Sequence, residues 1–308
     1  MSIIKRTYHK LFLIRFDPDP AIPYYKASDF KGLKEEEHTF TNSLGVEIHY
    51  FIYQKEVTKN KTLLFLPGMG PGHIAYFREI DELTSLGYKV ITLDYTGCGY
   101  SKGDHLPSMN TPTRDVIDLL NKLDNKEEIV IVGHSLGAYT ALNVINLKSD
   151  IHKAIIISGI MNAKGALYSF THSHIVANLL ARYERKLDKE YGNINNKKYL
   201  ETTTDDLLII QSNDDPTISY KYNFLRMVKI KNNHLNFVTV HDKKHNPSYT
   251  VESVNYKNKI IDTYMDRLNK NEFKSIEERK EYFKDVSIDK LTTQDKDFYK
   301  LITDYIEK

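Results

Sequence analysis

Residues 129–137 have the sequence Ile-Val-Ile-Val-Gly-His-Ser-Leu-Gly and constrain the fold more than any other stretch of the chain. Four β-branched residues in a row predict a short strand that is buried on both faces. The Gly-x-Ser-x-Gly pattern and the helical spacing that follows it predict a sharp turn from strand into helix. Side chains at positions 133 and 137 would collide in such a turn, and glycines stand there, so Ser135 is expected to be held in a strained conformation above the sheet edge. The pattern alone also fits an ordinary strand–glycine turn–helix connection without chemistry.

Strands and helices alternate around this stretch. Buried apolar runs predict strands at 62–66, 88–93, 154–158, 207–211 and 235–240. Helical spacing predicts helices at 74–86, 114–123 and 220–229 and a long amphipathic helix at 251–268. This alternation predicts an α/β fold, in which helices cover both faces of a mostly parallel central sheet.

Four segments depart from the alternation. Residues 38–55 predict an antiparallel hairpin that begins the sheet, and the weak alternation of residues 9–16 predicts an edge strand. Residues 159–205 are expected to form a small helical insertion. The charged tail at 270–308 is expected to be helical and packed on the surface.

Composition limits the possible classes of partner. The chain has 308 residues, of which 41% are hydrophobic, so a sizeable core is available. The net charge of +2, with basic and acidic residues interspersed, favours neither nucleic acid nor an anionic membrane. The single cysteine, Cys98, excludes an intrachain disulfide and suits a reducing compartment. No run of 18 apolar residues predicts a membrane span, so we expect a soluble cytoplasmic protein.

Serine, aspartate and histidine follow three of the predicted strands. A serine hydroxyl is a weak nucleophile that needs a base within hydrogen-bond reach, and a buried carboxylate must orient that base. The carboxyl ends of parallel strands meet at one edge of a sheet. Ser135, an aspartate after strand 207–211 and a histidine after strand 235–240 are therefore expected to meet there, in the chain order Ser, Asp, His.

Two carboxylates and two histidines compete for these roles. Asp215 is preferred over Asp214 because Pro216 biases it to an extended backbone that presents its side chain into the loop. His245 is preferred over His241, which lies at the strand end, because a position further into the loop gives reach toward Ser135.

The other reactive side chains are given structural readings. His134 is expected to pack beside the site, and Cys98, between two glycines, to fill a tight turn. His73, His172 and His174 are predicted to be ordinary polar positions, and no metal site is predicted.

The glycine-rich loop at residues 67–73 follows the strand at 62–66. Such a loop is either a tight strand–helix connection or a device that turns a backbone N–H toward the nucleophile, as half of an oxyanion hole. The Gly-x-Ser-x-Gly turn downstream favours the second reading.

These motifs resemble those of the α/β-hydrolase superfamily over residues 38–269. The resemblance rests on Gly133-His134-Ser135-Leu136-Gly137, on Asp94-Tyr95-Thr96-Gly97-Cys98-Gly99-Tyr100-Ser101, on Asp214-Asp215-Pro216 and on His245-Asn246-Pro247. It implies Ser135 as nucleophile, His245 as base, Asp215 as acid, and the N–H groups of Leu136 and Met69 as the oxyanion hole. One departure is Pro67-Gly68, where the family commonly has His-Gly.

The resemblance also implies a domain organisation. Residues 38–158 and 206–269 correspond to the hydrolase core, and residues 159–205 to a cap that roofs the pocket. Residues 1–37 are an N-terminal extension and residues 270–308 a C-terminal helical tail, and the resemblance covers neither.

The implied activity is two-step acyl transfer, without a metal or an organic cofactor, on a small-molecule acyl substrate. The leading hypothesis is a serine carboxylesterase that cleaves a small or medium acyl ester. The same three residues also suit a thioester, lactone, amide or peptide bond, since the fold hosts all of these. A non-catalytic scaffold that binds a ligand or partner is the third hypothesis. Epoxide hydrolase and dehalogenase chemistry is disfavoured because those reactions use a carboxylate where Ser135 stands.

Overall fold

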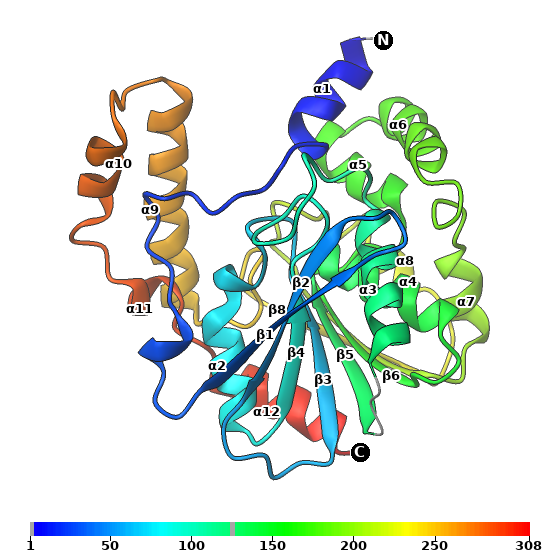
Figure 1. The fold of residues 1–308 in the computed structure, drawn as a ribbon. Helices are drawn as coiled ribbons and strands as arrows, with labels where there is room; N and C mark the ends of the chain where they lie inside the picture. The colour runs from blue at the N-terminus through cyan, green and yellow to red at the C-terminus, as the bar shows by residue number, and fades with distance from the viewer. Residues whose placement is uncertain (1–2, 124–126) are drawn as a thin grey trace.

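The computed structural model describes residues 3–123 and 127–308, and an eight-stranded open sheet lies at the centre of this part of the chain (Figure 1). The strands are β1 (Lys34–Thr41), β2 (Glu47–Gln54), β3 (Lys61–Leu66), β4 (Lys89–Leu93), β5 (Glu128–His134), β6 (Lys153–Ile157), β7 (Asp206–Ser212) and β8 (Leu235–Val240). Their spatial order is β1-β2-β4-β3-β5-β6-β7-β8. β1 and β2 form an antiparallel hairpin, β2 pairs antiparallel with β4, and all pairings from β4 to β8 are parallel. The mostly parallel sheet is thereby confirmed.

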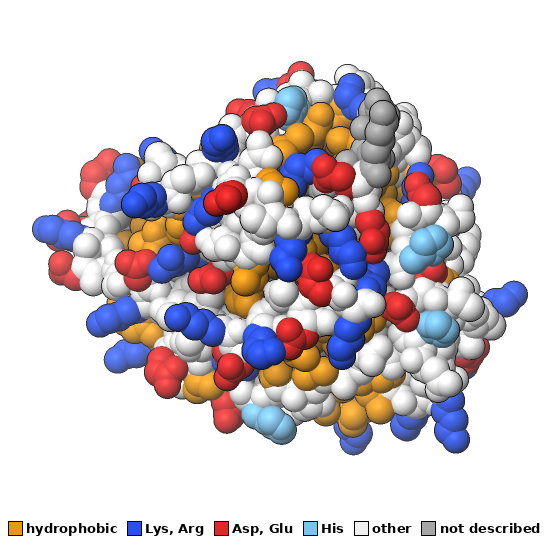
Figure 2. All heavy atoms as spheres, turned by 90° about the horizontal axis from the view of Figure 1, so that it is seen from below, with side chains coloured by type: hydrophobic (Ala, Val, Ile, Leu, Met, Phe, Trp, Pro, Cys, Tyr) orange, Lys and Arg blue, Asp and Glu red, His pale blue; other side chains and the backbone are white. Residues whose placement is uncertain are grey.

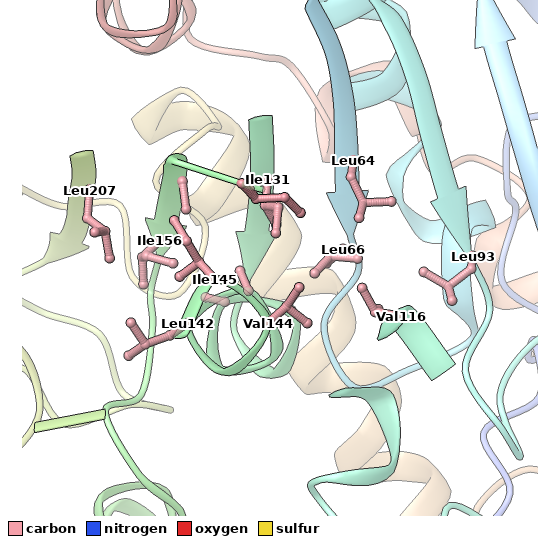
Figure 3. Packing of buried hydrophobic residues seen from close by; sticks show 14 of the residues in the cluster. Leu64, Leu66, Leu93, Val116, Ile131, Leu142, Val144, Ile145, Ile156 and Leu207 are labelled. Carbon is pink, nitrogen blue, oxygen red and sulfur yellow. The ribbon is translucent and has the colours of Figure 1, made fainter. Parts of the chain in front are cut away.

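One face of the sheet packs against α3 (Thr111–Lys122) and α4 (Leu136–Leu147). Because side chains alternate along a strand, Leu64 and Leu66 of β3 point to this face together with Ile131 of β5 and Ile156 of β6. Figure 3 shows these side chains around Leu142, Val144 and Ile145 of α4. The helix α4, which follows the Gly-x-Ser-x-Gly turn at residues 133–137 (the elbow), is thus fixed on the sheet by close packing along its length.

The other face packs against α2 (Phe77–Ser85) and α12 (Lys296–Ile306). The predicted helix at 74–86 begins as a short 3₁₀ turn, η2 (Gly72–Tyr76), before it continues as α2. In α12, Phe298, Tyr299, Ile302 and Ile306 are all buried. The prediction that the tail packs on the surface is therefore wrong for α12, which forms part of the core.

Lysines of two strands fix the end of α12. Lys61 of β3 donates a hydrogen bond to the carbonyl of Ile306 at 2.5 Å, and Lys153 of β6 donates to the same carbonyl at 3.2 Å. The last carbonyls of a helix receive no hydrogen bond from an N–H group of the same helix, and they carry partial negative charge. The ammonium groups of the two lysines therefore stabilise this end of α12.

The N-terminal segment forms a helix, α1 (Ile3–Phe12), where the sequence predicted an edge strand at 9–16. Tyr8 and Phe12 are one helical turn apart, and both are buried against Leu180 of the insertion. The helical period, which places these two rings on one face, therefore prevails over the weak alternation. Of the predicted strand, only Phe16 makes a bridge, to Cys98.

The insertion between β6 and β7 is helical, as expected, and lies on one side of the molecule in Figure 1. It contains α5 (Ala163–Thr171), α6 (His174–Leu187) and α7 (Asn196–Thr202), and the predicted helix at 220–229 is the short α8 (Phe224–Met227). On the opposite side lie α9 (Val251–Asn269), α10 (Ile276–Phe283) and α11 (Ile288–Leu291). A short 3₁₀ turn, η1 (Ala27–Asp29), precedes β1.

The N-terminal segment crosses from the insertion to α9 (Figure 1). There Asp19 accepts a hydrogen bond from the Tyr264 hydroxyl at 2.7 Å and forms an ion pair with Arg279 of α10. These contacts tie α9 and α10 to the start of the chain.

The molecular surface mixes both signs of charge, as Figure 2 shows for the face seen from below. Within the described residues, no helix is long and apolar enough to cross a membrane.

Candidate active site

Ser135 lies at the turn between β5 and α4 with a φ of 55° and a ψ of −115°. Such a conformation costs about 1–3 kcal/mol for a residue with a side chain and is maintained only where its surroundings enforce it. Here a hydrogen bond from the Ser135 N–H to the carbonyl of Ile157 at 2.9 Å anchors the turn. A Cβ at position 133 would lie 2.3 Å from the Gly137 carbonyl oxygen, and one at position 137 would lie 2.0 Å from that of Leu66. The glycines that the sequence analysis singled out are therefore required by close backbone approach.

Asp215 and His245 are joined by a hydrogen bond. His245 Nδ1 lies 2.8 Å from Asp215 Oδ2, and the carboxylate is fully buried. The other oxygen of Asp215 accepts from the backbone N–H groups of Thr217 and Ile218 at 2.8 and 2.9 Å. With its lone pairs occupied in this way, the carboxylate holds Nδ1 of His245 in the protonated tautomer and leaves Nε2 as the acceptor.

The competing residues lie elsewhere. Asp214 accepts from the Ser212 hydroxyl at 2.5 Å and pairs with Lys244 Nζ at 3.0 Å, so it closes the loop between β7 and β8. His241 is exposed at the end of β8. The geometry thus favours the two residues that the sequence analysis preferred.

Ser135 and His245 line one cavity of about 340 Å³. Its walls are Gly68, Met69, Tyr76, His134, Ser135, Pro216, Thr217, Lys244, His245, Asn246, Lys257, Asn258 and Asp262. Three of these belong to α9 and none to residues 159–205, which the structure describes throughout.

The expectation that the insertion roofs the pocket is not met for this cavity. On the insertion side of the elbow, the apolar side chains of Leu136, Tyr139, Ile160, Ala166 and Ile218 form a buried cluster that fills the space. The cavity beside Ser135 therefore extends toward α9.

A chain of hydrogen bonds that the sequence analysis missed connects the loops around Ser135. Gly68 N–H donates to the Tyr76 hydroxyl at 2.9 Å, and this hydroxyl lies 2.9 Å from His134 Nδ1. His134 Nε2 lies 2.7 Å from the backbone carbonyl of His245 and donates to it, which leaves Nδ1 to accept from Tyr76. Burial, with a smaller contribution from the neighbouring His245, lowers the pKa of His134 to about 3, so the His134 imidazole stays neutral. His134 therefore packs beside the site, as predicted, and also links the glycine-rich loop to the loop of His245.

The glycine-rich loop lies directly against the elbow. A Cβ added at Gly68 would be 3.3 Å from Ser135 Cβ. Among the described residues, the N–H of Met69 has no protein acceptor, whereas the N–H of Gly68 donates to the Tyr76 hydroxyl. Leu136 is the first residue of α4, where N–H groups lack partners inside the helix. These are the two N–H groups that the family resemblance implies for an oxyanion hole.

The other reactive side chains have structural roles or lie at the surface. Burial raises the pKa of the Cys98 thiol, so it is protonated and no nucleophile. His73 is also buried, and its Nδ1 lies 3.0 Å from Asp94 Oδ1, which joins the glycine-rich loop to the turn after β4. His174 stacks on Tyr168, and His172 is exposed.

The open, mostly parallel sheet and the Gly-x-Ser-x-Gly elbow define an α/β hydrolase. Residues 58–240, more than half of the chain, match the family model described as serine aminopeptidase, S33, and the chain belongs to this family.

Individual relatives match over shorter segments. The chain is 29% identical over 108 residues to a putative chloroplastic methylesterase of Arabidopsis thaliana, and 30% identical over 130 residues to an epoxide hydrolase of Caballeronia sordidicola. These segments cover 34% and 42% of this chain and 31% and 38% of the relatives, so the chain spans only about a third of their length. Among solved structures, an esterase of Pyrococcus furiosus superposes with a TM-score of 0.59 at 17% identity, covering 83% of this chain and 96% of that one. This last similarity concerns the fold.

Proposed function

We propose that this chain is a serine hydrolase that cleaves a carboxylic ester through an acyl-enzyme intermediate. The observation that carries the proposal is the 2.8 Å hydrogen bond between the buried Asp215 carboxylate and His245, in the cavity that the strained Ser135 also lines. A binding scaffold has no chemical need for this combination. A serine at the elbow also favours acyl transfer over the chemistry of the epoxide hydrolase relative.

In the proposed reaction, Ser135 Oγ attacks the ester carbonyl while His245 Nε2 takes the hydroxyl proton. Asp215 stabilises the imidazolium that forms, without itself becoming protonated. The N–H groups of Met69 and Leu136 hold the oxyanion, a contribution worth on the order of 10²–10³ in kcat for each donor. His245 then protonates the leaving alcohol. Water, activated by His245, attacks the acyl-enzyme and releases the acid.

The description of the family as aminopeptidases makes peptide cleavage a second candidate. An aminopeptidase has to bind the protonated amino terminus of its substrate, which favours acidic groups near the nucleophile. Two lysines, Lys244 and Lys257, line this cavity, and among the described residues the one carboxylate in its lining is that of Asp262. The charge of the lining therefore favours the ester over the free peptide.

A panel of chromogenic esters of graded acyl length tests the proposal when run beside Ser135→Ala. We expect turnover by the wild type and loss of turnover in the variant, with an unchanged circular dichroism spectrum. Aminoacyl 4-nitroanilides serve as the peptidase arm. Ester turnover that survives in Ser135→Ala would refute the assignment of the nucleophile, and turnover of the anilides alone would replace the ester by a peptide.

A further inference from the structure

One of the two lysines in the cavity of Ser135 lacks a carboxylate partner. Lys257 extends from α9, and its Nζ lies 3.2 Å from the amide oxygen of Asn246, the neighbour of His245. The same ammonium lies 4.7 Å from the centre of the Tyr249 ring. Lys244, in contrast, is paired with Asp214 at 3.0 Å. Within the described ranges, no carboxylate lies within 4.0 Å of Lys257 Nζ.

The surroundings of Lys257 leave its charge uncompensated. Burial lowers the pKa of this ammonium, which reflects the cost of removing a cation from water. The nearby carboxyl that counteracts this effect belongs to Glu79, and burial raises the pKa of Glu79 to about 7. Near neutral pH this carboxyl is therefore protonated in a large part of the molecules. A neutral amide and an aromatic ring stabilise a cation but do not neutralise it.

Lys257 also borders an apolar cavity of about 200 Å³. The residues of this second cavity come mainly from the N-terminal segment, η2, α2, α9 and α11, and include Tyr24, Tyr25, Ile74, Phe77, Ile261 and Leu291. Apolar walls on one side reduce the screening of the ammonium by water, so an anion that enters from the side of Ser135 meets a stronger attraction than at an exposed lysine.

We propose that Lys257 binds a carboxylate of the substrate, so that the substrate is an ester that carries a second, anionic carboxyl group. The inference rests on the proposed ester hydrolysis and names its substrate class. Lys257 is a specificity-determining residue in this account and takes no part in the proton transfers.

The test compares esters that differ in one carboxylate. The anionic probes are 4-nitrophenyl hydrogen glutarate, with the charge on the acyl side, and 4-acetoxybenzoate, with the charge on the alcohol side. Their neutral counterparts are 4-nitrophenyl pentanoate and methyl 4-acetoxybenzoate. We expect the wild type to prefer the anionic member of at least one pair in kcat/KM by about tenfold or more, as is typical of a hydrogen bond between charged groups.

Lys257→Met, which keeps the length of the side chain, is expected to abolish this preference and to leave turnover of the neutral ester similar. Lys257→Arg is expected to retain it. Lys259→Met is the matched control, since Lys259 is exposed on the same helix and does not line the cavity. The retained turnover of the neutral esters shows that each variant is folded.

Two results would overturn the inference while the proposed ester hydrolysis stands. The first is Ser135-dependent turnover of the neutral esters with no preference for either anionic probe. The second is a preference that persists in Lys257→Met. The absence of turnover of all four esters by the wild type would instead contradict the proposed function itself, and the substrate class with it.

Discussion

Replacing Tyr76 with phenylalanine removes a single oxygen atom from the hydrogen-bond chain around Ser135. That hydroxyl accepts from Gly68 N–H and lies 2.9 Å from both Gly68 N and His134 Nδ1. In the variant, Nδ1 of the buried His134 loses its donor and Gly68 N–H loses its acceptor. Each lost hydrogen bond costs about 1 kcal/mol net, and an unsatisfied buried group adds to this, so we expect a loss of about 2–3 kcal/mol in the free energy of unfolding.

For a chain of this length, unfolding entropy scales such that 1 kcal/mol corresponds to about 1.5 °C in Tm. The expected decrease in Tm for Tyr76→Phe is therefore about 3–5 °C. The variant is also expected to lose activity, because the same hydroxyl positions Gly68 beside Ser135 and, through His134, the loop of His245. Urea denaturation and thermal unfolding, both monitored by circular dichroism, measure the change in stability. The kcat for the best chromogenic ester measures the change in activity.

Tyr50→Phe is the matched control. Tyr50 is also buried, but among the described residues its hydroxyl has no protein hydrogen-bond partner. We expect this variant to be as stable and as active as the wild type. The reasoning is refuted if both variants behave alike, or if Tyr76→Phe loses stability while its kcat is unchanged.

Three further predictions concern the acid of the site, the glycine-rich loop and a buried carboxyl group. Asp215→Asn removes the acceptor for His245, so kcat should fall on the order of 10³–10⁴-fold in ester assays, whereas Asp214→Asn should have a far smaller effect; equal losses would refute the assignment. Gly68→Ala places a methyl group 2.7 Å from the Tyr76 hydroxyl and should lower kcat by about 10²-fold or more by displacing the loop, and wild-type kinetics would contradict this. Burial raises the pKa of Glu79 from 4.5 in the unfolded chain to about 7 in the folded protein. Between these two pH values the folded protein keeps a proton on Glu79 that the unfolded chain has lost. Wild-type stability therefore falls as the pH rises from 4.5 through 7, and Glu79→Gln should gain about 2–3 kcal/mol over the wild type between pH 5 and 8 in urea titrations; parallel pH profiles would contradict the sign.

The sheet and the elbow were predictable from the sequence because their signals are local. A run of four β-branched residues specifies β5, and Gly133 and Gly137 specify the turn at Ser135, with no knowledge of distant segments. The order of strand ends then limits the partners to a few loops. This is why Asp215 and His245 could be preferred before their 2.8 Å hydrogen bond was seen.

The parts that were missed depend on contacts between distant segments. The helix α1 is stabilised by burial of Tyr8 and Phe12 on the insertion, about 170 residues away in the chain, and a weak local alternation cannot reveal this. The sequence of α12 shows its amphipathic pattern, but whether its apolar face covers the sheet or a surface groove depends on the space that α2 leaves.

The hydrogen-bond chain through Tyr76 was missed for a similar reason. Tyr76 follows the glycine-rich loop, and nothing in the pattern of an aromatic residue there distinguishes a core side chain from a partner of His134. The wall of the cavity was also placed on the wrong element. The family resemblance indicated residues 159–205, whereas a filled apolar cluster closes that side and Lys257 of α9 borders the cavity instead.

The central claim is that Ser135 is a nucleophile activated by His245. Its most direct test is reaction of the folded protein with a fluorophosphonate, followed by intact mass and peptide mapping. We predict one adduct per chain, on Ser135, that forms rapidly in the wild type, slowly in His245→Gln and not at all in Ser135→Ala. An adduct on another residue, or none in a wild-type protein shown to be folded, would contradict the account.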